Sequence, residues 1–220
     1  METSGNPEAA FMGRIAASTT HEFRNILAIV KESAGLIEDL VEQCRQFGPE
    51  QAERLLKTAN RIDAQVGRGA ELLSHLNRFA HCIDRSLNGV DLDQEVDQVV
   101  FLSQRLARQG RQRLEMIPGS EELMIMVDSL HFQMALFAAV EGCLEQVPDE
   151  GSITVRTTRT GTGSTVEFTG EAADGSALPS PTGASGWVGM TALFEGLGAS
   201  VDVGEDGYVF TITLPVADDA

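Results

Sequence analysis

Basic residues are missing from the last part of the sequence. After Arg159 there is no lysine or arginine, whereas nine aspartates and glutamates follow. Residues 89–220 hold 6 Lys/Arg against 21 Asp/Glu, a net charge of −15, while residues 1–88 hold 10 against 12, a net charge of −2. Nucleic acids and anionic membranes both require a positive protein surface. We therefore expect neither a nucleic acid nor a membrane among the partners.

Cysteine is also scarce, and long apolar runs are absent. The three cysteines, Cys44, Cys82 and Cys143, are far apart and form no Cys-x-x-Cys pair. This pattern argues against a disulfide framework or a zinc site and favours buried free thiols. No run of about 18 apolar residues occurs, and the first ten residues lack the basic start and apolar stretch of a signal peptide. We therefore expect a cytoplasmic protein.

The first 88 residues are patterned as two long amphipathic helices. No proline interrupts residues 8–47, and Gly48-Pro49 then ends one helix and starts a second over residues 49–84. One antiparallel hairpin cannot cover both apolar stripes, so we predict a homodimer in which two hairpins form a four-helix bundle. The stripes consist of Phe23, Ile26, Val30, Ile37, Leu40 and Cys44, widened by Leu27, Ala34 and Val41, and of Leu55, Ala59, Ile62, Val66, Leu73, Leu76 and Ile83, with Gly69 as a weak layer.

Residues 89–220 mix helical and strand patterns and form a second predicted domain. We expect an α/β sandwich with a largely antiparallel sheet, which makes the whole chain α+β. Helices are predicted over residues 90–106, 129–146 and 188–197, strands over 113–117, 153–157, 166–169, 200–203 and 208–214, a buried strand around Met124 to Met126, and a loop over 172–185.

The stretch THEFRNILA places one histidine, His21, on the outer face of the first helix. An exposed neutral imidazole is a good nucleophile for phosphoryl groups, and Glu22 beside it can fix the tautomer or accept its proton. Asn25, one turn further on, can orient a water or a phosphoryl oxygen. Metal ligation is disfavoured because no other histidine or cysteine lies at i+3 or i+4. From its position alone, an inert surface histidine is about as plausible as a functional one.

This stretch resembles the H-box of two-component sensor histidine kinases, which commonly reads H-E-[hydrophobic]-[R/K]-[N/T]-x-L. Residues 7–87 resemble the dimerisation and phosphotransfer hairpin of these proteins, and residues 90–215 resemble their ATP-binding catalytic domain. The segments 192–203 and 210–215 match the end of that domain well. The resemblance implies that His21 is a phosphoacceptor and that the receiver domains of response regulators are partners.

The ATP site of that family is degraded in this sequence. The asparagine that holds magnesium falls at Gly142, the aspartate that reads adenine falls near Gly170, and Asp174 comes a few residues late. The glycine-rich lid is reduced to residues 186–189, with Trp187 where a small residue usually stands. A triphosphate without cationic neighbours would be poorly neutralised. We therefore expect no ATP hydrolysis and no cofactor bound by this chain.

These observations favour a histidine phosphotransferase that passes phosphoryl groups through His21 to and from response-regulator aspartates. Mg²⁺ is expected on the partner receiver domain, and Glu22 and Asn25 are expected to act with His21. Contacts with the phosphoryl group or the regulator are expected from Arg14, Arg24 and Lys31.

Three alternatives remain at the level of sequence. The chain could be a divergent autokinase, a regulator phosphatase in which Asn25 positions water, or a non-catalytic scaffold that binds regulators. The other histidines, His75, His81 and His131, are expected to be structural or solvated, because none has an acidic residue directly adjacent.

Overall fold

The structure is a computed structural model that describes residues 6–43, 48–82, 88–121, 123–161, 163–204 and 208–215. The chain divides into two compact units, Met12–Arg78 and a second formed by Met1–Phe11 together with Phe79–Ala220. We call them the hairpin unit and the α/β unit, and each is described by itself.

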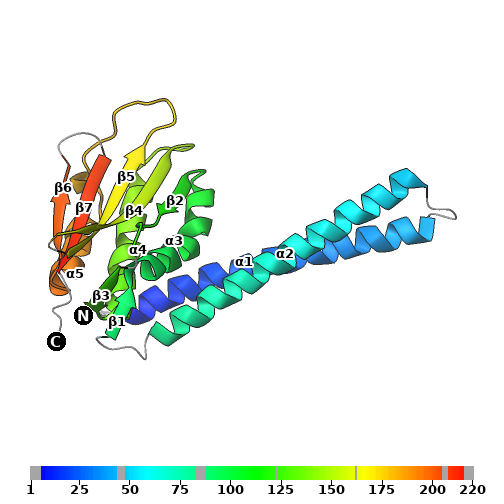
Figure 1. The fold of residues 1–220 in the computed structure, drawn as a ribbon. Coiled ribbons are helices and arrows are strands. Elements are labelled where there is room, and N and C mark those ends of the chain that lie inside the picture. Colours follow the sequence, from blue (N-terminus) through cyan, green and yellow to red (C-terminus); the bar gives the residue numbers. More distant parts are fainter. Residues whose placement is uncertain are drawn as a thin grey trace, which may run out of the picture. The chain divides into compact units, whose positions relative to one another are not determined.

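Two long helices, α1 (Pro7–Gln43) and α2 (Pro49–Cys82), form an antiparallel hairpin (Figure 1). Each begins with a proline. Proline has no backbone N–H group, but the N–H groups in the first turn of a helix have no partner within the helix, so no hydrogen bond is lost there. Asn6 caps α1, because its Oδ1 accepts a hydrogen bond from the backbone N–H of Glu8 at 3.0 Å. The predicted hairpin is confirmed, while the predicted helix ends at Phe47 and Asp84 lie outside the described residues.

The helices meet along a narrower seam than the apolar stripes predict. Ile26 on α1 and Leu72 on α2 are each only 5% exposed. A Cβ built on Gly69 would lie 3.7 Å from Ile26 Cγ2, so Gly69 faces α1 at the level of Ile26. Four residues of the predicted stripes stay more than half exposed in the single chain: Leu27 at 63%, Val41 at 52%, Val66 at 56% and Leu73 at 55%.

The α/β unit contains two sheets. The larger has the strand order β2-β4-β5-β7-β6; β2 pairs with β4 in parallel and the other pairs are antiparallel. The smaller pairs β1 with β3 in antiparallel fashion. The predicted, largely antiparallel sheet is confirmed. The strands are β1 (Asn88–Asp91), β2 (Arg113–Ile117), β3 (Met124–Val127), β4 (Ser152–Thr160), β5 (Gly163–Glu171), β6 (Ser200–Val203) and β7 (Tyr208–Pro215).

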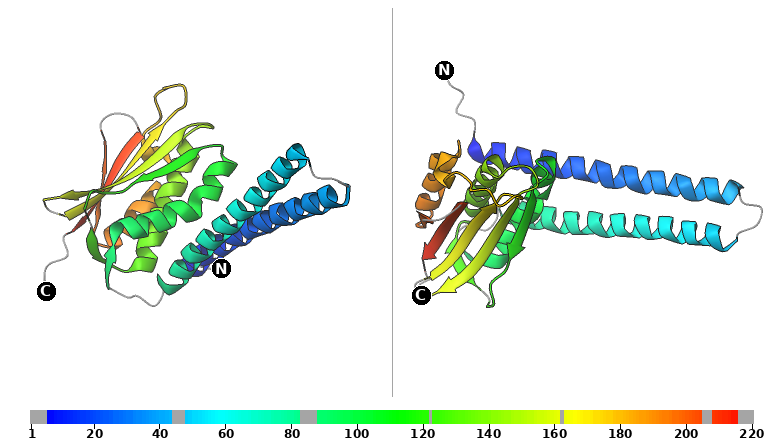
Figure 2. Two further views of the ribbon diagram at one scale, coloured as in Figure 1. Left: turned by 45° about the vertical axis from the view of Figure 1, so that its right-hand side comes forward. Right: turned by 90° about the horizontal axis from the view of Figure 1, so that it is seen from above.

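Helices cover one face of the larger sheet (Figure 2). Along β4 buried and less buried residues alternate, and Ile153 and Val155 are fully buried, as a strand with one covered face requires. Phe210 on β7 stacks on Phe168 of β5, with 4.8 Å between the ring centroids, and Phe194 on α5 meets Phe132 on α4. The helices are α3 (Leu92–Gln109), α4 (Ser129–Gln146) and α5 (Trp187–Gly196), with a 3₁₀ turn, η1, at Pro181–Gly183.

Two features of the α/β unit correct the sequence prediction. Strand β1 was not predicted, and the helix expected from residue 90 begins at Leu92, because Asp91 Oδ1 accepts a hydrogen bond from Asp93 N at 2.9 Å and caps it. The strand around Ile125 exists, but the expectation that it is buried is wrong for Met124 and Met126, which are about half exposed. Of these three residues only Ile125 is buried.

The first turns of α1 and the end of α2 share the core of the α/β unit. The Phe11 ring lies 5.5 Å from that of Phe79 and 5.4 Å from that of Phe137, both in edge-on geometry. Such aromatic pairs contribute about 0.5–1.5 kcal/mol beyond the area they bury. No described helix is long and apolar enough to cross a membrane.

Candidate functional site

His21 lies on the solvent-exposed side of α1, as its predicted position on the outer face of the helix requires. Asn25, one turn further along the helix, brings its amide Nδ2 to 3.3 Å from His21 Nδ1. The i, i+4 spacing places both side chains on the same side of the helix. The amide therefore lies at Nδ1, and among the described residues no hydrogen-bond partner lies at Nε2.

Glu22 is held by the other helix. Its carboxylate forms an ion pair with Arg68 of α2, 46 residues away in the sequence, and its side chain is only 13% exposed. Successive residues on a helix point about 100° apart, so Glu22 turns toward α2 while His21 turns toward solvent. Arg68 was missed at the level of sequence, because no local spacing links it to the THEFRNILA stretch.

The predicted partner-binding residues Arg14, Arg24 and Lys31 are all exposed on α1. They lie within three turns of His21, a distance that long flexible side chains can partly span. Further along the hairpin Glu32 pairs with Arg61 at 3.6 Å, a second link between the helices. The structure thus brings His21 and Asn25 together, directs Glu22 to Arg68, and places the three basic residues on the exposed surface of α1.

One space inside the α/β unit is almost filled by side chains. Between α4, α5 and β7 only about 10 Å³ of cavity remains, lined by Ala139, Gly142, Trp187, Met190 and Phe210 among others. That is near the lower limit for a single water molecule. Trp187 packs edge-on against Phe210, with ring centroids 5.3 Å apart, so the bulky residue of the reduced lid occupies the space.

Hydrogen bonds close this region further. Tyr208 donates its hydroxyl to the Gly142 carbonyl at 3.2 Å, and Ser185 donates from N and Oγ to Glu145 Oε2 at 3.1 and 2.8 Å. Burial raises the pKa of the Cys143 thiol to about 12, and it raises the pKa of Tyr208 as well. Both groups are therefore neutral at physiological pH and serve as packing.

The two glycines at the positions of the family's ATP-site residues differ in the space around them. A Cβ on Gly142 would lie 3.6 Å from Ala184 Cβ, an ordinary van der Waals contact. At Gly170 a Cβ would approach Tyr208 Cδ1 to 2.7 Å, which no real side chain does. Asp174 lies in an exposed turn, where its Oδ1 accepts a hydrogen bond from Ser176 N at 2.9 Å.

Comparisons with known proteins place the fold. No family model matches the sequence, and no curated protein matches it. Among solved structures, the nucleotide-free catalytic domain of histidine kinase ThkA superposes with a TM-score of 0.50 at 16% identity, over 60% of this chain and 97% of that chain. The α/β unit therefore has the fold of a histidine kinase catalytic domain.

Two other solved structures extend along most of the chain. Histidine kinase AdeS of Acinetobacter baumannii is 14% identical with a TM-score of 0.47, over 90% of this chain and 98% of that chain. The complex of ThkA with the response regulator protein TrrA gives 16% identity and a TM-score of 0.48, over 94% of this chain and 62% of that chain. With a helical hairpin before an ATPase-like α/β domain, the chain is sensor-histidine-kinase-like in fold, and the family resemblance is confirmed at that level.

Proposed function

We propose that the chain is a homodimeric histidine phosphotransferase. His21 accepts a phosphoryl group from the aspartyl phosphate of one receiver domain and returns it to the aspartate of another, and no ATP is used. The observation that carries this proposal is the contact of Asn25 with His21 Nδ1, because it leaves Nε2 directed outward on an exposed helix face.

The accepting step needs a free lone pair on Nε2. This lone pair attacks phosphorus, an N–P bond forms, the P–O bond to the aspartate breaks, and the aspartate leaves as a carboxylate. Nε2 has this lone pair only when the neutral ring carries its proton on Nδ1. The structure presents the Asn25 amide nitrogen, a donor, to Nδ1; a flip of the amide, which exchanges Nδ2 and Oδ1, lets Nδ1–H donate to Oδ1 and stabilises the reactive tautomer. Mg²⁺ on the receiver would neutralise the phosphoryl oxygens, and the return step reverses the sequence.

Arg68 supports the same site from the second helix. By pairing with Glu22 it fixes the carboxylate next in sequence to the nucleophile and ties the two helices together at this level. Arg14, Arg24 and Lys31 supply positive charge on α1, which suits a phosphorylated, acidic receiver surface. Three basic residues thus lie on the same helix as His21, where a phosphoryl group would arrive.

Independence from ATP is supported by the filled region between α4, α5 and β7. A cavity of about 10 Å³ cannot admit a nucleotide, and opening it would expose Trp187 and Phe210. We therefore propose that the α/β unit has a structural and docking role. The test is a melt with ATP and Mg²⁺: a ligand at 100 times its Kd should stabilise by about 2.7 kcal/mol, and such a shift would point to the autokinase alternative.

Homodimerisation is supported by the exposed residues of the hairpin. Leu27, Ala34 and Val41 follow one another at intervals of seven, as do Ala59, Val66 and Leu73. Seven-residue spacing is that of a coiled-coil seam, and burying one large aliphatic side chain contributes about 1.5–3 kcal/mol. His21 is six residues before Leu27, which turns it about 120° away from this strip. A second hairpin can therefore cover the strip without covering the nucleophile.

The decisive experiment incubates the purified chain with a phosphorylated receiver domain and then with a second, unphosphorylated one. The proposal requires acid-labile label on His21 after the first step and its appearance on the second receiver after the next. Label that never reaches the chain, while the first receiver keeps its phosphate, would leave the scaffold alternative.

A phosphatase is the second candidate, and the position of Asn25 favours it. An amide 3.3 Å from the His21 ring can also hold a water in line with a receiver's phosphoryl group. Asn25→Ala separates the two: a relay keeps labelled His21, whereas a phosphatase loses its ability to discharge the regulator. Release of inorganic phosphate from a receiver by the His21→Ala variant would favour the phosphatase.

A further inference from the structure

A second surface of the α/β unit, unrelated to His21, has the features of a docking site. A hollow of about 480 Å³ lies between the end of β3, the start of α4 and the last turns of α5. Met126, Ala192, Leu193 and Leu197 supply its apolar lining, while Asp128 and His131 form one polar end. We call it the β3–α5 groove.

Helix α5 is too apolar for a helix that faces solvent. Its sequence, WVGMTALFEG, contains one charged residue, Glu195, and Val188 in its first turn is 78% exposed. Surface helices normally carry polar residues on their outer face, and a helix that is apolar on all sides is normally buried. The outer face of α5 therefore has the composition of an interface.

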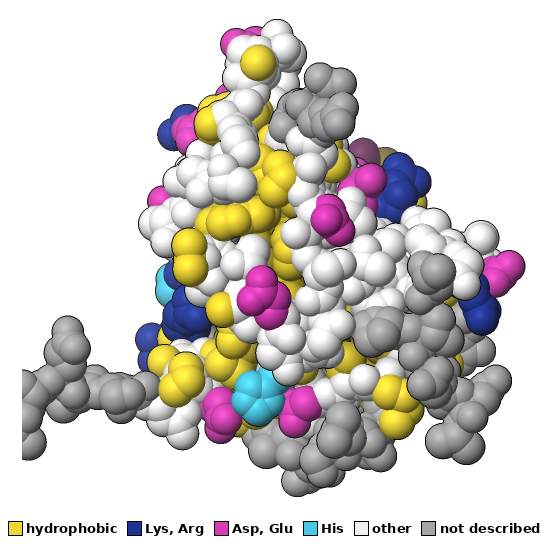
Figure 3. All heavy atoms as spheres, turned by 90° about the vertical axis from the view of Figure 1, so that its left-hand side faces the viewer, with side chains coloured by type: hydrophobic (Ala, Val, Ile, Leu, Met, Phe, Trp, Pro, Cys, Tyr) yellow, Lys and Arg dark blue, Asp and Glu magenta, His cyan; other side chains and the backbone are white. Residues whose placement is uncertain are grey.

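Apolar side chains continue beyond the hollow onto the small sheet. Met124 and Met126 lie on the face of β3 over Gly89 of β1, where a Cβ would be 3.4 Å from Met124 Cε and 3.6 Å from Met126 Sδ. Methionine is flexible and polarisable, and it is frequent at surfaces that adapt to a partner. Hydrophobic side chains form a band down this side of the molecule, with acidic side chains along it (Figure 3).

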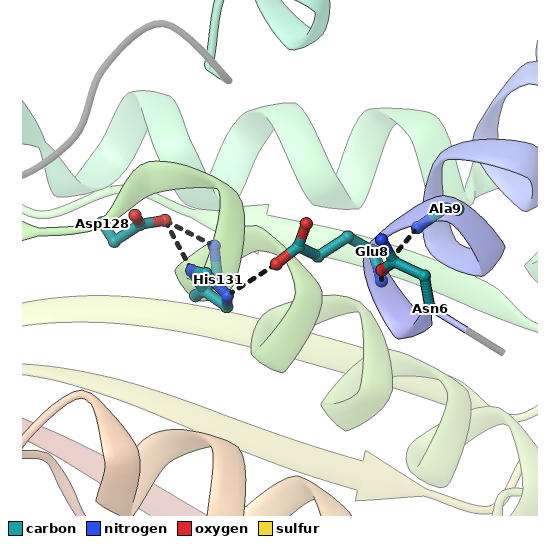
Figure 4. A network of polar contacts seen from close by, with 5 residues as sticks. All are labelled: Asn6, Glu8, Ala9, Asp128 and His131. Atoms are coloured by element: carbon teal, nitrogen blue, oxygen red, sulfur yellow. Dashed lines mark hydrogen bonds and ion pairs between the residues drawn. The ribbon is translucent and has the colours of Figure 1, made fainter. Parts of the chain in front are cut away.

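The polar end of the groove is acidic. His131 Nδ1 lies 2.9 Å from Asp128 Oδ1, and its Nε2 lies 3.3 Å from Glu8 Oε1, so the ring stands between two carboxylates (Figure 4). Asp128 also caps α4, accepting a hydrogen bond from His131 N at 2.9 Å. Glu195 adds a further negative charge on α5, and from residue 160 onward the sequence offers no lysine or arginine. The described residues that line the groove thus include Asp128 but no lysine or arginine.

We propose that the β3–α5 groove binds an amphipathic helix of a partner protein whose apolar face is flanked by lysine or arginine. The apolar lining would take side chains spaced at i, i+3 or i+4 and i+7, the usual pattern of a helix in a groove. The basic flank would meet Asp128, Glu8 and Glu195, which gives the pairing its charge complementarity. A second copy of this acidic unit would bring like charges together. The proposal is independent of phosphoryl transfer at His21.

The test uses the full chain and a defined probe, a fluorescent 15-residue helical peptide of leucine and lysine with all leucines on one face. Anisotropy titrations in 150 mM NaCl compare the wild type with Met126→Lys, which places a cation in the groove. Ile117→Lys is the matched control, because it makes the same change of charge at a partly exposed apolar residue on β2, the opposite edge strand of the large sheet. A scrambled peptide of the same composition controls for attraction to net charge alone.

We expect saturable binding that weakens at least tenfold with Met126→Lys, stays within twofold with Ile117→Lys, and is at least tenfold weaker for the scrambled peptide. Equal binding of the two peptides, or equal loss in both variants, would overturn the proposal. A change in oligomeric mass caused by Met126→Lys would assign the groove to a second copy instead. Thermal melts of both variants establish that each is folded before titration.

Discussion

The two units of this chain differ in how completely they bury their apolar residues. The hairpin leaves Leu27, Val66 and Leu73 more than half exposed, whereas the α/β unit leaves only about 10 Å³ of space between α4, α5 and β7. Apolar side chains are thus uncovered in the single-chain hairpin and closely packed in the α/β unit. Under the proposed function, the hairpin would supply the nucleophile and the dimer interface, and the α/β unit would take no part in ATP chemistry.

The largest expected effect separates function from stability in the hairpin. His21→Ala should reduce phosphoryl acceptance to background, a loss of at least 100-fold, because no other group replaces Nε2. Stability should change by only about 0.5 kcal/mol or less, since an exposed side chain is removed. Label transfer and urea unfolding measure the two quantities. His81→Ala, at an exposed histidine of α2, is the control and should keep full labelling; unfolding of His21→Ala would assign the ring to packing.

The second prediction concerns the open strip of the hairpin. Val66→Asp should convert a dimer at micromolar concentration into a monomer, because it places a charge within the seam that two hairpins would share. Light scattering gives the mass. Ala64→Asp is matched in charge and helix, but lies two residues away on another face, and it should remain dimeric. A dimeric Val66→Asp variant would place the interface elsewhere.

Much of the architecture could be predicted from sequence because the signals were local and repeated. The seven-residue spacing around Ile26, the Gly48-Pro49 break and the alternation along Ile153 and Val155 each predict an element, and each is confirmed. Strand β1 could not be found in this way. It has four residues, and the signal that starts α3 is the side chain of Asp91, which resembles an ordinary helical residue until its hydrogen bond is seen.

The contacts of the candidate site also differ in whether local sequence spacing predicts them. His21 and Asn25 are one helical turn apart, so their contact follows from spacing alone. Arg68 and the closure by Trp187, Tyr208 and Ser185 depend on residues far apart in sequence. Sequence indicated that Trp187 was out of place, but not that its ring would pack on Phe210. The sequence indicates that residues expected of a nucleotide site are missing. Only the tertiary structure shows that side chains fill the space between α4, α5 and β7.

A third prediction compares the same substitution in both units. Leu136→Ala on α4 should destabilise the protein by about 2–5 kcal/mol, because the side chain is 1% exposed and a cavity would remain. Leu56→Ala on α2, where the leucine is 65% exposed, should change stability by about 0.5 kcal/mol or less. Urea unfolding at one protein concentration measures both. Similar losses would mean that Leu56 is covered in solution.

The fourth prediction uses the carboxylate at the start of α4. Burial raises the pKa of Asp128, but hydrogen bonds from His131 outweigh this and hold it below its usual value. A lowered folded-state pKa stabilises the protein above the unfolded value, about pH 3.9, and this contribution is lost as the pH falls through the folded pKa. Asp128→Ala should cost about 0.5–2 kcal/mol at pH 7.

Asp128→Asn isolates the charge at that position, because asparagine still caps a helix. Its deficit relative to the wild type should be present at pH 7 and should shrink toward zero below pH 4. Urea unfolding at pH 7 and pH 3 provides the comparison. A deficit that is unchanged by pH would show that the Asp128 carboxylate contributes through its shape and not through its charge.

The smallest effect is expected from Arg68→Ala. This substitution tests how much the ion pair between Arg68 and Glu22 contributes to joining the two helices beside His21. The Arg68 side chain is 40% exposed, so its ion pair with Glu22 is screened by solvent, and Arg68→Ala should cost at most about 1 kcal/mol. A double-mutant cycle with Glu22→Gln isolates the pair from other contacts of either residue. Because salt screens exposed charges, the coupling should fall between 50 mM and 500 mM NaCl. Coupling that persists at high salt would mean that the pair is shielded in the dimer, which would bring Arg68 into the shared bundle and make the hairpin less open than the single chain suggests.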